Sequence, residues 1–548
     1  MRPVGLVLAL AVALLLGGCT TIPDAGSVQA GPTSVPDDPA LVFQPYPPPP
    51  GADPADIVSG FVQAASAGRD YRVAKEFLTP AFAGRWAPND RVLVHNQAVT
   101  ARSVGQNRVE LAVPTIARVD GAGVYTPTTR NSVLRYSLLK VSGQWRIDDG
   151  PDGVVLDQEV FAHNFQQATL QYFDPTFTRL VPDLRWFPFP LSTSRVVRAL
   201  IGGRAPPLAA PVSASAFPDG TAVRSLSTSA GVLTLSIRVS GAAPSATATT
   251  RMQQQLVRSL PPSITALRLV VDGRSMPTAA PLHPVPSDTR PAVLAGGRFG
   301  VLNAQGALVE NRELGKSIAA AHPSAITVSA RQRFAAVLSP AGASVVQAGR
   351  ATRVIDPRVG LLAPTADQSG WIYTVPAGDP EGLIAHSLNG QGVTLPVTLG
   401  GSEVLALEAS PDGTRMLVVL RTQAGSQAYV AGIERSANGT PIGLSAARYL
   451  FAAGPDPITD GTWVDDGSVS LLTAGPQGQE VAKQPLGGLS SSLGRLSSAV
   501  STMVGGTEQG GPRVLTEDTG DLYVSAGDNQ WQPEFDLPVK VSVLAVQR

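Results

Sequence analysis

The sequence predicts a multi-domain protein in which α+β domains are followed by an all-β domain of the β-propeller type. Its 548 residues are too many for a single hydrophobic core. Helical and strand patterns both occur over residues 51–283, whereas residues 284–548 contain short alternating runs separated by glycine-containing turns. The chain has one cysteine, so its stability has to come from packed cores and not from internal disulfides.

Residues 1–18 are expected to be a lipoprotein signal peptide. A charged Arg2 precedes an apolar run over residues 4–16, and two small residues follow before Cys19. The run is shorter than the roughly 20 residues that a membrane-spanning helix needs. We therefore expect the segment to be cleaved. An ordinary secretory signal with an incidental cysteine is the alternative.

The stretch Leu16-Gly17-Gly18-Cys19 resembles the bacterial lipobox. This resemblance implies that signal peptidase recognises Leu16, Gly17 and Gly18, and that Cys19 becomes the first residue of the mature chain. Cys19 would carry a diacylglycerol on its sulfur and an N-linked acyl group such as palmitate. Its acyl chains would anchor the protein at the extracytoplasmic face of the cell membrane, because each buried methylene contributes about 0.8 kcal/mol.

Residues 19–50 are predicted to be a tether between the lipidated cysteine and the first domain. Residues 20–50 contain nine prolines and end in YPPPP. This composition favours extended polyproline II over helix or central strand. Apolar side chains in the later part of the tether, at Leu41, Phe43 and Tyr46, could instead pack against a domain surface.

Residues 51–171 are predicted to form an α+β domain. Asp53 and Pro54 mark the start of a helix with an apolar stripe, and a second helix is expected to end at Pro80. Alternating runs over residues 91–147 predict an antiparallel sheet, and residues 154–172 have a helical pattern. This order is similar to that of the nuclear-transport-factor-like cone fold, which often encloses a pocket.

Residues 172–283 resemble the GerMN module of spore-germination lipoproteins. The resemblance rests on ordered elements: a helix STSRVVRALIGG, a P-D-G turn, a hairpin turning at Ser229-Ala230-Gly231, a helix TRMQQQLVRSLPP and a strand ALRLVVDG. A proline-rich insert, APPLAAPV, departs from that pattern. The resemblance implies an α+β domain.

The aromatic stretch RWFPFP over residues 185–190 has two interpretations. Core packing at a domain junction is favoured. A surface that contacts a partner is the alternative, since arginine and aromatic side chains are enriched in interaction hot spots.

Residues 284–548 are predicted to form a β-propeller of about six blades, at about 45 residues per blade. Turns that end in glycine recur before alternating runs, at Gly306, Gly342, Gly370, Gly413, Gly467 and Gly520. Their uneven spacing fits blades with loops of variable length better than a tight solenoid. The SPDG turn that ends at Gly413 is similar to the turns of TolB-like and WD-like blades, in which aspartate caps the turn and glycine accepts positive φ.

No catalytic, metal-binding or cofactor-binding residues are predicted. A G-x-S-x-G motif is absent and the five histidines are scattered along the sequence. Glu310 replaces a required glycine before ELGKS, which otherwise resembles the end of a phosphate loop. Two acidic turns, residues 148–159 and 456–467, resemble calcium loops incompletely, because Gly150 and Ile458 occupy ligand positions; plain turn chemistry is favoured.

Equal numbers of basic and acidic residues, 42 of each, exclude a bulk positive field that would attract nucleic acid, so no nucleic-acid partner is expected. The order of lipobox, tether, cone-like domain, GerMN-like module and propeller resembles the LpqB family of actinobacterial lipoproteins. This resemblance implies an accessory lipoprotein that is not an enzyme. It would bind the extracellular sensor domain of the histidine kinase MtrB and modulate MtrAB two-component signalling in cell-wall homeostasis and division.

A second function class remains open beside this one. The cone pocket or the propeller mouth could bind a cell-wall fragment or another small ligand, which would make the protein a receptor. A pocket lined by aromatic and convergent polar groups would favour the receptor, whereas a closed apolar pocket would argue against it. An enzyme assembled from polar clusters of separate blades is the least favoured class.

Overall fold

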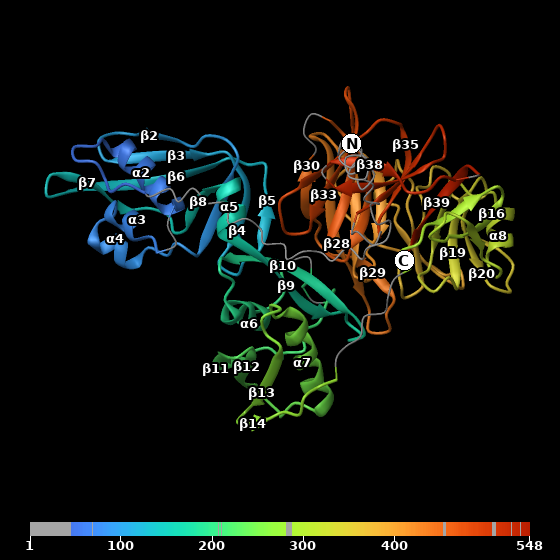
Figure 1. The fold of residues 1–548 in the computed structure, drawn as a ribbon, viewed down its shortest axis with the longest axis horizontal. Helices are drawn as coiled ribbons and strands as arrows, with labels where there is room; N and C mark the ends of the chain where they lie inside the picture. The colour runs from blue at the N-terminus through green and yellow to red at the C-terminus, as the bar shows by residue number, and fades with distance from the viewer. Residues whose placement is uncertain are drawn as a thin grey trace, which may run out of the picture. The chain divides into compact units, whose positions relative to one another are not determined.

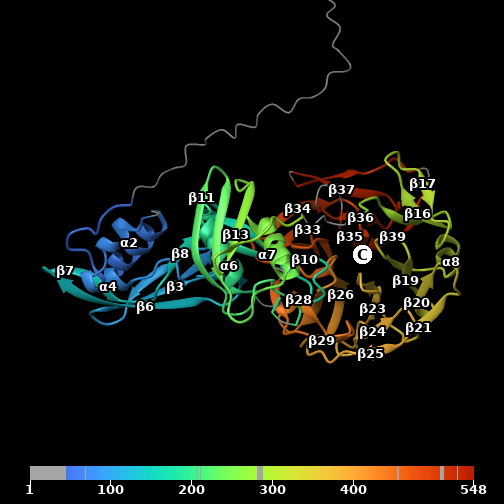
Figure 2. The same cartoon turned by 90° about the horizontal axis from the view of Figure 1, so that it is seen from below.

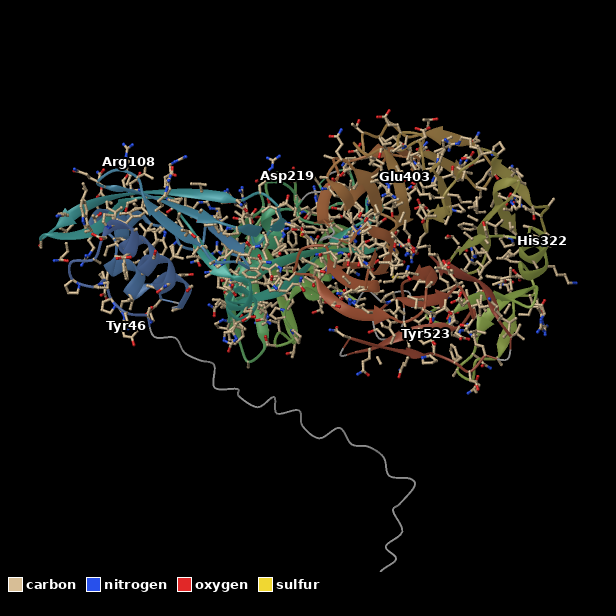
Figure 3. All side chains as sticks on the ribbon, turned by 90° about the horizontal axis from the view of Figure 1, so that it is seen from above. Tyr46, Arg108, Asp219, His322, Glu403 and Tyr523 are labelled. Atoms are coloured by element: carbon tan, nitrogen blue, oxygen red, sulfur yellow. The ribbon has the colours of Figure 1, made fainter. Side chains whose placement is uncertain are left out.

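The computed structural model describes residues 45–548 except 68–69, 206–207, 210, 281–287, 453–455, 507–510, 528 and 538. Tyr46–Arg548 form one compact unit. Tyr46 lies at the start of this unit and is 79% exposed (Figure 3). The predicted lipidation site Cys19 and the predicted peptidase-recognition residues Leu16, Gly17 and Gly18 lie outside the described residues.

The first domain packs three helices against two four-stranded sheets (Figure 1). The sheets have the orders β5-β4-β1-β8 and β2-β3-β6-β7, and β1 and β8 are parallel. Helix α2 begins at Pro54, as the sequence predicts, and buries Ile57, Val58 and Phe61. The elements are α2 Pro54–Ala67, α3 Arg72–Glu76, α4 Pro80–Arg85, β1 Arg91–His95, β2 Thr100–Ser103, β3 Arg108–Val113, β4 Thr115–Asp120, β5 Tyr125–Pro127, β6 Ser132–Val141, β7 Gln144–Asp149 and β8 Val154–Asp157.

Pro80 begins helix α4, and the expectation that it ends the second helix is wrong. Helix α3 has already stopped at Glu76. Thr79 caps α4, because its Oγ1 accepts a hydrogen bond from the Phe82 amide at 3.3 Å. Proline suits the first helical position, where its missing N–H has no intrahelical partner to lose.

The predicted helix over residues 154–172 is also wrong. The segment forms β8, then a short helix α5 Gln158–Asn164, then strand β9 Phe165–Phe173. Strand β8 pairs with β1, and β9 pairs along its whole length with β10 Leu180–Pro188. Strand pairing, with distant β1 for β8 and within a hairpin for β9, therefore overrides the helical pattern.

The β9–β10 hairpin leads into the GerMN-like domain, whose four-stranded sheet has the order β11-β12-β13-β14. Strands β12 and β13 are parallel, and helix α7 makes the crossover between them. The hairpin turn falls where it is predicted, with Ala230 and Gly231 at φ 47° and 75°. The elements are α6 Thr193–Gly202, β11 Ala222–Ser229, β12 Val232–Arg238, α7 Ala246–Ser259, β13 Ala266–Val271 and β14 Arg274–Ser275.

One face of the hairpin belongs to the core of the GerMN-like domain. Leu170 and Tyr172, two residues apart on β9, are fully buried and share a hydrophobic cluster with Leu200 of α6 and Met252 of α7. Burial of one strand face against two helices fixes how the hairpin leaves the domain.

In the described part of the C-terminal region, one eight-stranded, one five-stranded and three four-stranded sheets surround a common axis (Figure 2). The eight-stranded sheet consists of two blades, β17-β16-β15-β39 and β18-β19-β20-β21, joined where β39 pairs with β18, so the sheets give the about six blades that the sequence predicts. The last strand, β39 Val541–Gln547, pairs with β15 Ala292–Ala295, so strands from both ends of the region share one blade. This pairing closes the ring and covers the sheet edges that would otherwise remain open.

The remaining propeller strands follow in chain order. They are β16 Arg298–Leu302, β17 Leu308–Glu310, β18 Ala325–Val328, β19 Phe334–Ser339, β20 Gly342–Gln347, β21 Arg353–Asp356, β22 Thr365–Ala366, β23 Trp371–Thr374, β24 Ile384–Ser387, β25 Gly392–Thr394, β26 Glu403–Ala409, β27 Arg415–Thr422, β28 Gly425–Arg435, β29 Pro441–Leu444, β30 Arg448–Ala452, β31 Ile458–Asp465, β32 Ser468–Gly475, β33 Gly478–Pro485, β34 Ser491–Leu496, β35 Val500–Val504, β36 Arg513–Thr516, β37 Leu522–Gly527 and β38 Gln530–Pro533. Helix α8 Gly315–Ala320 follows β17. Strand β30 pairs with β28 as an additional strand of the blade β26-β27-β28-β29.

The recurring glycine turns are not equivalent positions of the blades. Gly370, Gly413 and Gly467 lie between the first and second strands of their blades, whereas Gly342 and Gly520 lie between the second and third. Because neighbouring strands are antiparallel, these two groups of turns lie on opposite faces of the propeller. The uneven spacing in the sequence therefore reflects two kinds of turn as well as loop length.

Candidate functional site

Strand β10 contacts both of the other domains as well as its own. The Trp186 amide donates to the Gly123 carbonyl of the first domain at 2.8 Å. The Trp186 indole N–H donates to the Gly487 carbonyl of the propeller at 2.6 Å. The Pro182 carbonyl accepts from the guanidinium of Arg415 in the propeller at 3.3 Å. A single strand thus carries contacts to every part of the described chain.

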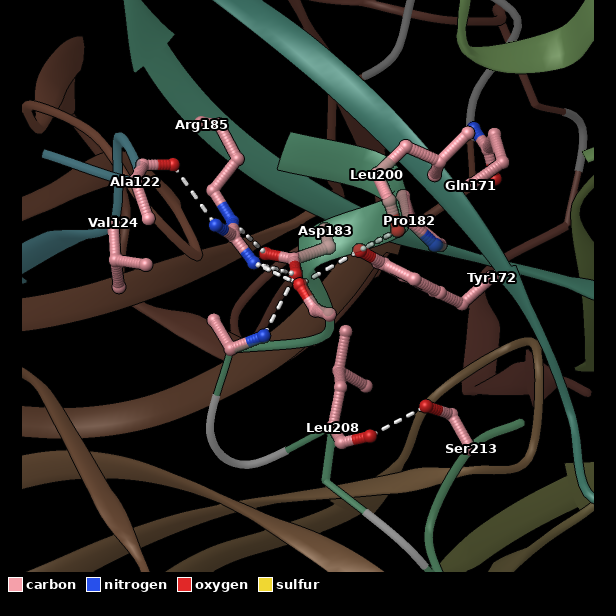
Figure 4. A network of polar contacts seen from close by, with 12 residues as sticks. Ala122, Val124, Gln171, Tyr172, Pro182, Asp183, Arg185, Leu200, Leu208 and Ser213 are labelled. Carbon is pink, nitrogen blue, oxygen red and sulfur yellow. Dashed lines mark hydrogen bonds and ion pairs between the residues drawn. The ribbon is translucent and has the colours of Figure 1, made fainter. Parts of the chain in front are cut away.

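A buried ion pair lies at the centre of these contacts (Figure 4). The guanidinium of Arg185 binds the carboxylate of Asp183 through two bonds of 3.0 and 2.8 Å, and the two side chains are only 2% and 5% exposed. Arg185 also donates to the Ala122 carbonyl of the first domain at 2.9 Å and to the Gly203 carbonyl after α6 at 3.0 Å. The Ala205 amide completes the network by donating to Asp183 at 2.9 Å.

Tyr172 extends this network into the GerMN-like domain. Its hydroxyl donates to the carbonyl groups of Leu200 and Gly203, at 3.1 and 2.8 Å, where helix α6 ends. Burial raises the pKa of Tyr172 above the ordinary tyrosine value, and the nearby Asp183 acts in the same direction. The hydroxyl therefore stays protonated and satisfies carbonyl groups that the helix end leaves free.

The stretch RWFPFP is mainly junction packing, as the favoured interpretation has it. Arg185 is buried, Phe187 is 3% exposed, and the ring of Trp186 lies 4.9 Å from the ring of Phe161. Phe189 is the most exposed of its aromatic side chains, at 45%.

Arg415 provides the matching anchor on the propeller. Its side chain is 1% exposed and pairs with Asp412, the aspartate of the SPDG turn. It also donates to the Asp466 carbonyl at 2.6 Å, and its guanidinium lies 5.3 Å from the centre of the Trp463 ring. Sequence reasoning identified the turn and missed this contact. The available signal was a charged residue at the start of the otherwise apolar run RMLVVL.

A cleft of about 580 Å³ lies between the hairpin and the propeller. Its hairpin-side wall is formed by Gln167, Thr169, Gln171, Thr178, Arg179, Leu180, Pro182, Leu184 and Arg258 of α7. Its propeller wall is formed by Ala330, Gln368, Pro411, Asp412, Asp465, Asp466, Gly467, Ser468, Lys483 and Pro485. A second cavity of about 250 Å³ shares several of these propeller residues and extends to Arg548. We call the first of these spaces the junction cleft.

Asp466 is the least satisfied polar group of the junction cleft. Its Oδ1 atom is buried and has no hydrogen-bond partner in the described residues. Burial, and secondarily the charge of Asp412, raise the pKa of Asp466 from 3.8 to about 7, while Arg415 acts in the opposite direction. The group can therefore gain or lose a proton near neutral pH.

The cavity described in the first domain is much smaller. It has a volume of about 10 Å³, because side chains such as Phe61, Leu93, Leu134 and Tyr136 fill it. In the described residues the predicted cone pocket is therefore filled, and the junction cleft is a space that the sequence did not predict. Among the described residues, no histidine, cysteine or acidic side chains gather as a metal site, and no helix is long and apolar enough to cross a membrane.

Three family descriptions match the chain in the order of its domains. Residues 47–162 match "Lipoprotein LpqB, N-terminal domain", and residues 313–542 match "Lipoprotein LpqB beta-propeller domain". Residues 169–276, between them, match "Sporulation and spore germination".

Curated proteins with similar sequences are named Lipoprotein LpqB. The protein from Cutibacterium acnes is 28% identical over 461 residues, which cover 77% of each chain. The protein from Streptomyces coelicolor is 25% identical over 531 residues, which cover 84% of each chain. The match to the Rhodococcus opacus protein is 30% identical but spans 40% of this chain and 37% of that relative.

Solved structures resemble part of the chain. TolB from Acinetobacter baumannii is 16% identical with a TM-score of 0.34, over 48% of this chain and 68% of TolB. A chain from a nidogen/laminin complex is 9% identical with a TM-score of 0.36, over 47% of this chain and 98% of that chain.

The variant Arg185→Gln should lower the free energy of unfolding by about 3–5 kcal/mol, because it leaves the Asp183 carboxylate buried without its cation. Urea unfolding followed by tryptophan fluorescence measures this loss. The matched control is Arg290→Gln, whose pair with Asp288 is half exposed on the arginine side. That control should change stability by less than about 1 kcal/mol. Equal losses in both variants would contradict the central role of Arg185.

The variant Asp466→Asn should flatten the dependence of stability on pH. An acid whose pKa is raised on folding binds its proton more tightly in the folded chain, so stability falls as pH rises from about 4 to about 7. Asparagine cannot ionise, so the variant should gain at least about 1 kcal/mol over the parent between pH 5 and pH 8. Urea unfolding at several pH values across this range measures the difference in stability. Burial also raises the pKa of Asp460 to about 7, so Asp460 makes a second contribution to the pH dependence of stability, which Asp460→Asn should remove. A parent-like slope in Asp466→Asn would refute the assignment.

Proposed function

Because the chain belongs to the LpqB lipoprotein family, we propose that it is an accessory lipoprotein of an MtrAB-type two-component system. In this proposal the protein is anchored through Cys19 at the extracytoplasmic face of the cell membrane. It binds the sensor domain of the histidine kinase and modulates its signalling in cell-wall homeostasis and division. The predicted domain boundaries, 51–171, 172–283 and 284–548, are part of the same proposal.

The observation that supports this function is the junction at β10. Contacts from Arg185, Trp186 and Pro182 tie the first domain, the GerMN-like domain and the propeller together. A joined unit of this size offers a large surface to a partner while losing little freedom on binding. The proline-rich tether adds a second effect, because confinement to the membrane raises the effective concentration of the unit around a membrane-bound kinase.

A receptor for small ligands, including cell-wall fragments, is the second candidate function. The junction cleft meets part of the criterion for a receptor, because a volume of about 580 Å³ lies in the range of small-molecule sites and polar groups converge on it. Its described lining residues include no aromatic side chain. The closed cavity of the first domain argues against a ligand there. We assign no catalytic step to either candidate.

Replacing the lipidated residue tests the role of the anchor. The variant Cys19→Ser should be exported without lipid, leave the membrane fraction and restore less regulator phosphorylation than the parent at equal abundance, because it loses its local concentration near the kinase. The same variant behind a single membrane-spanning helix is the control and should restore signalling. Full signalling from the untethered variant would contradict the anchoring part of the proposal.

Crosslinking in living cells identifies the partner in the same strains. A photoreactive residue at exposed positions of the GerMN-like domain, such as Arg198, should capture the kinase sensor domain. Capture of glycan or of nothing, together with unchanged signalling after deletion of the gene, would refute the kinase accessory function and favour the receptor.

A further inference from the structure

The junction cleft is bounded by a propeller wall whose position is set by hydrogen bonds within the propeller. Asp465 fixes the turn below it, since it accepts from the Gly467 amide and the Ser468 hydroxyl, each at 2.7 Å. The carbonyl of Asp466 is held by Arg415. The carboxylate of Asp466 therefore occupies a defined place, although its Oδ1 atom has no partner in the described residues. Buried polar atoms without a partner are rare in native proteins, so this oxygen can accept from a donor that the described residues do not supply.

The opposite wall presents arginines. Arg179 follows the tight turn between β9 and β10, where Asp174 accepts the amides of Thr178 and Arg179, each at 2.7 Å. Arg258 lies in the last turn of α7. Neither guanidinium makes an ion pair with a carboxylate in the described part of the chain. Guanidinium groups bind carboxylates through two parallel hydrogen bonds, so both are suited to an anionic ligand group.

Other charges that line the cleft are already compensated. Asp412 is paired with Arg415, and Asp465 lies 3.7 Å from Lys483. Two arginines on one wall and one aspartate on the other therefore remain for a ligand. Arg179 opposes the effect of burial on the pKa of Asp466, which indicates that these groups act across the same space.

This arrangement discriminates between ligand classes. A phosphate group would satisfy the arginines, but its negative charge would repel the Asp466 carboxylate when that group is ionised. A molecule with a carboxylate at one end and an N–H group at the other satisfies both walls. Thr169 and Gln171 are two residues apart on β9 and therefore lie on the same face of the strand. Their side chains add hydrogen-bonding groups between the two ends of such a ligand.

We propose that the junction cleft binds a short peptide or amino-acid derivative with a free carboxylate at Arg179 and Arg258 and an N–H donor at Asp466. The proposal names the ligand class of the second candidate function and rests on it. It does not depend on the proposed kinase contact, which the crosslinking experiment tests separately.

Calorimetric titration of the full chain in detergent tests the proposal with four probes. The probes are trialanine, its C-terminal amide, its N-acetyl form and inorganic phosphate. Trialanine should bind, and loss of its carboxylate in the amide should weaken binding about tenfold or more. The N-acetyl form should bind more weakly than trialanine when Asp466 is ionised, because it loses the charged donor, and phosphate should not compete.

Three variants locate the binding site. Arg258→Gln should reproduce the loss that the amide shows, and Asp466→Asn should remove the difference between trialanine and its N-acetyl form. Arg198→Gln on α6 is the matched control, because Arg198 is exposed and does not line the cleft. Thermal unfolding at the same pH confirms that each variant is folded. The proposal would be overturned if trialanine did not bind, if phosphate bound in its place, or if all three variants bound trialanine equally. A capture of the kinase by crosslinking would remain valid in each of these cases.

Discussion

The guanidinium of Arg185 joins the first domain to the GerMN-like domain, and the docking of these two domains depends on it. It binds Asp183 on its own strand, a carbonyl of the first domain and a carbonyl after α6. Burying a charge is costly unless its partner and its hydrogen bonds are all in place, so the contact is formed completely or not at all. A hairpin that docked through neutral side chains would not need an ion pair and a complete set of hydrogen bonds in this way.

The junction explains why a cleft exists. Strand β10 meets the propeller through Arg415 and Gly487, while Arg179 and Arg258 line the open space beside these contacts. The space between these points remains open and is lined with polar groups. Binding of a ligand that spans both walls would stabilise the docked hairpin, because the ligand would contact both sides at once.

Local chemistry made much of the fold predictable. Pro54 at the start of α2, the turn at Ala230 and Gly231, and Gly413 at φ 73° follow from residue preferences that need no partner. The residues of strand β9 are predicted as helix, because the order of apolar residues in this segment does not show that it pairs with β10. The candidate site was harder still, since its walls come from segments up to about three hundred residues apart in the sequence and only the fold brings them together.

Hydrogen exchange of the backbone amides of β10 in the full chain tests the central claim most directly. If the junction joins the three domains, the Trp186 amide, bonded to Gly123 across the domain boundary, should exchange as slowly as amides of the inner propeller strand β26. Exchange as fast as that of exposed loops, with the propeller still protected, would contradict it. That outcome would mean that the first domain moves independently of the rest and that β10 does not hold the unit together.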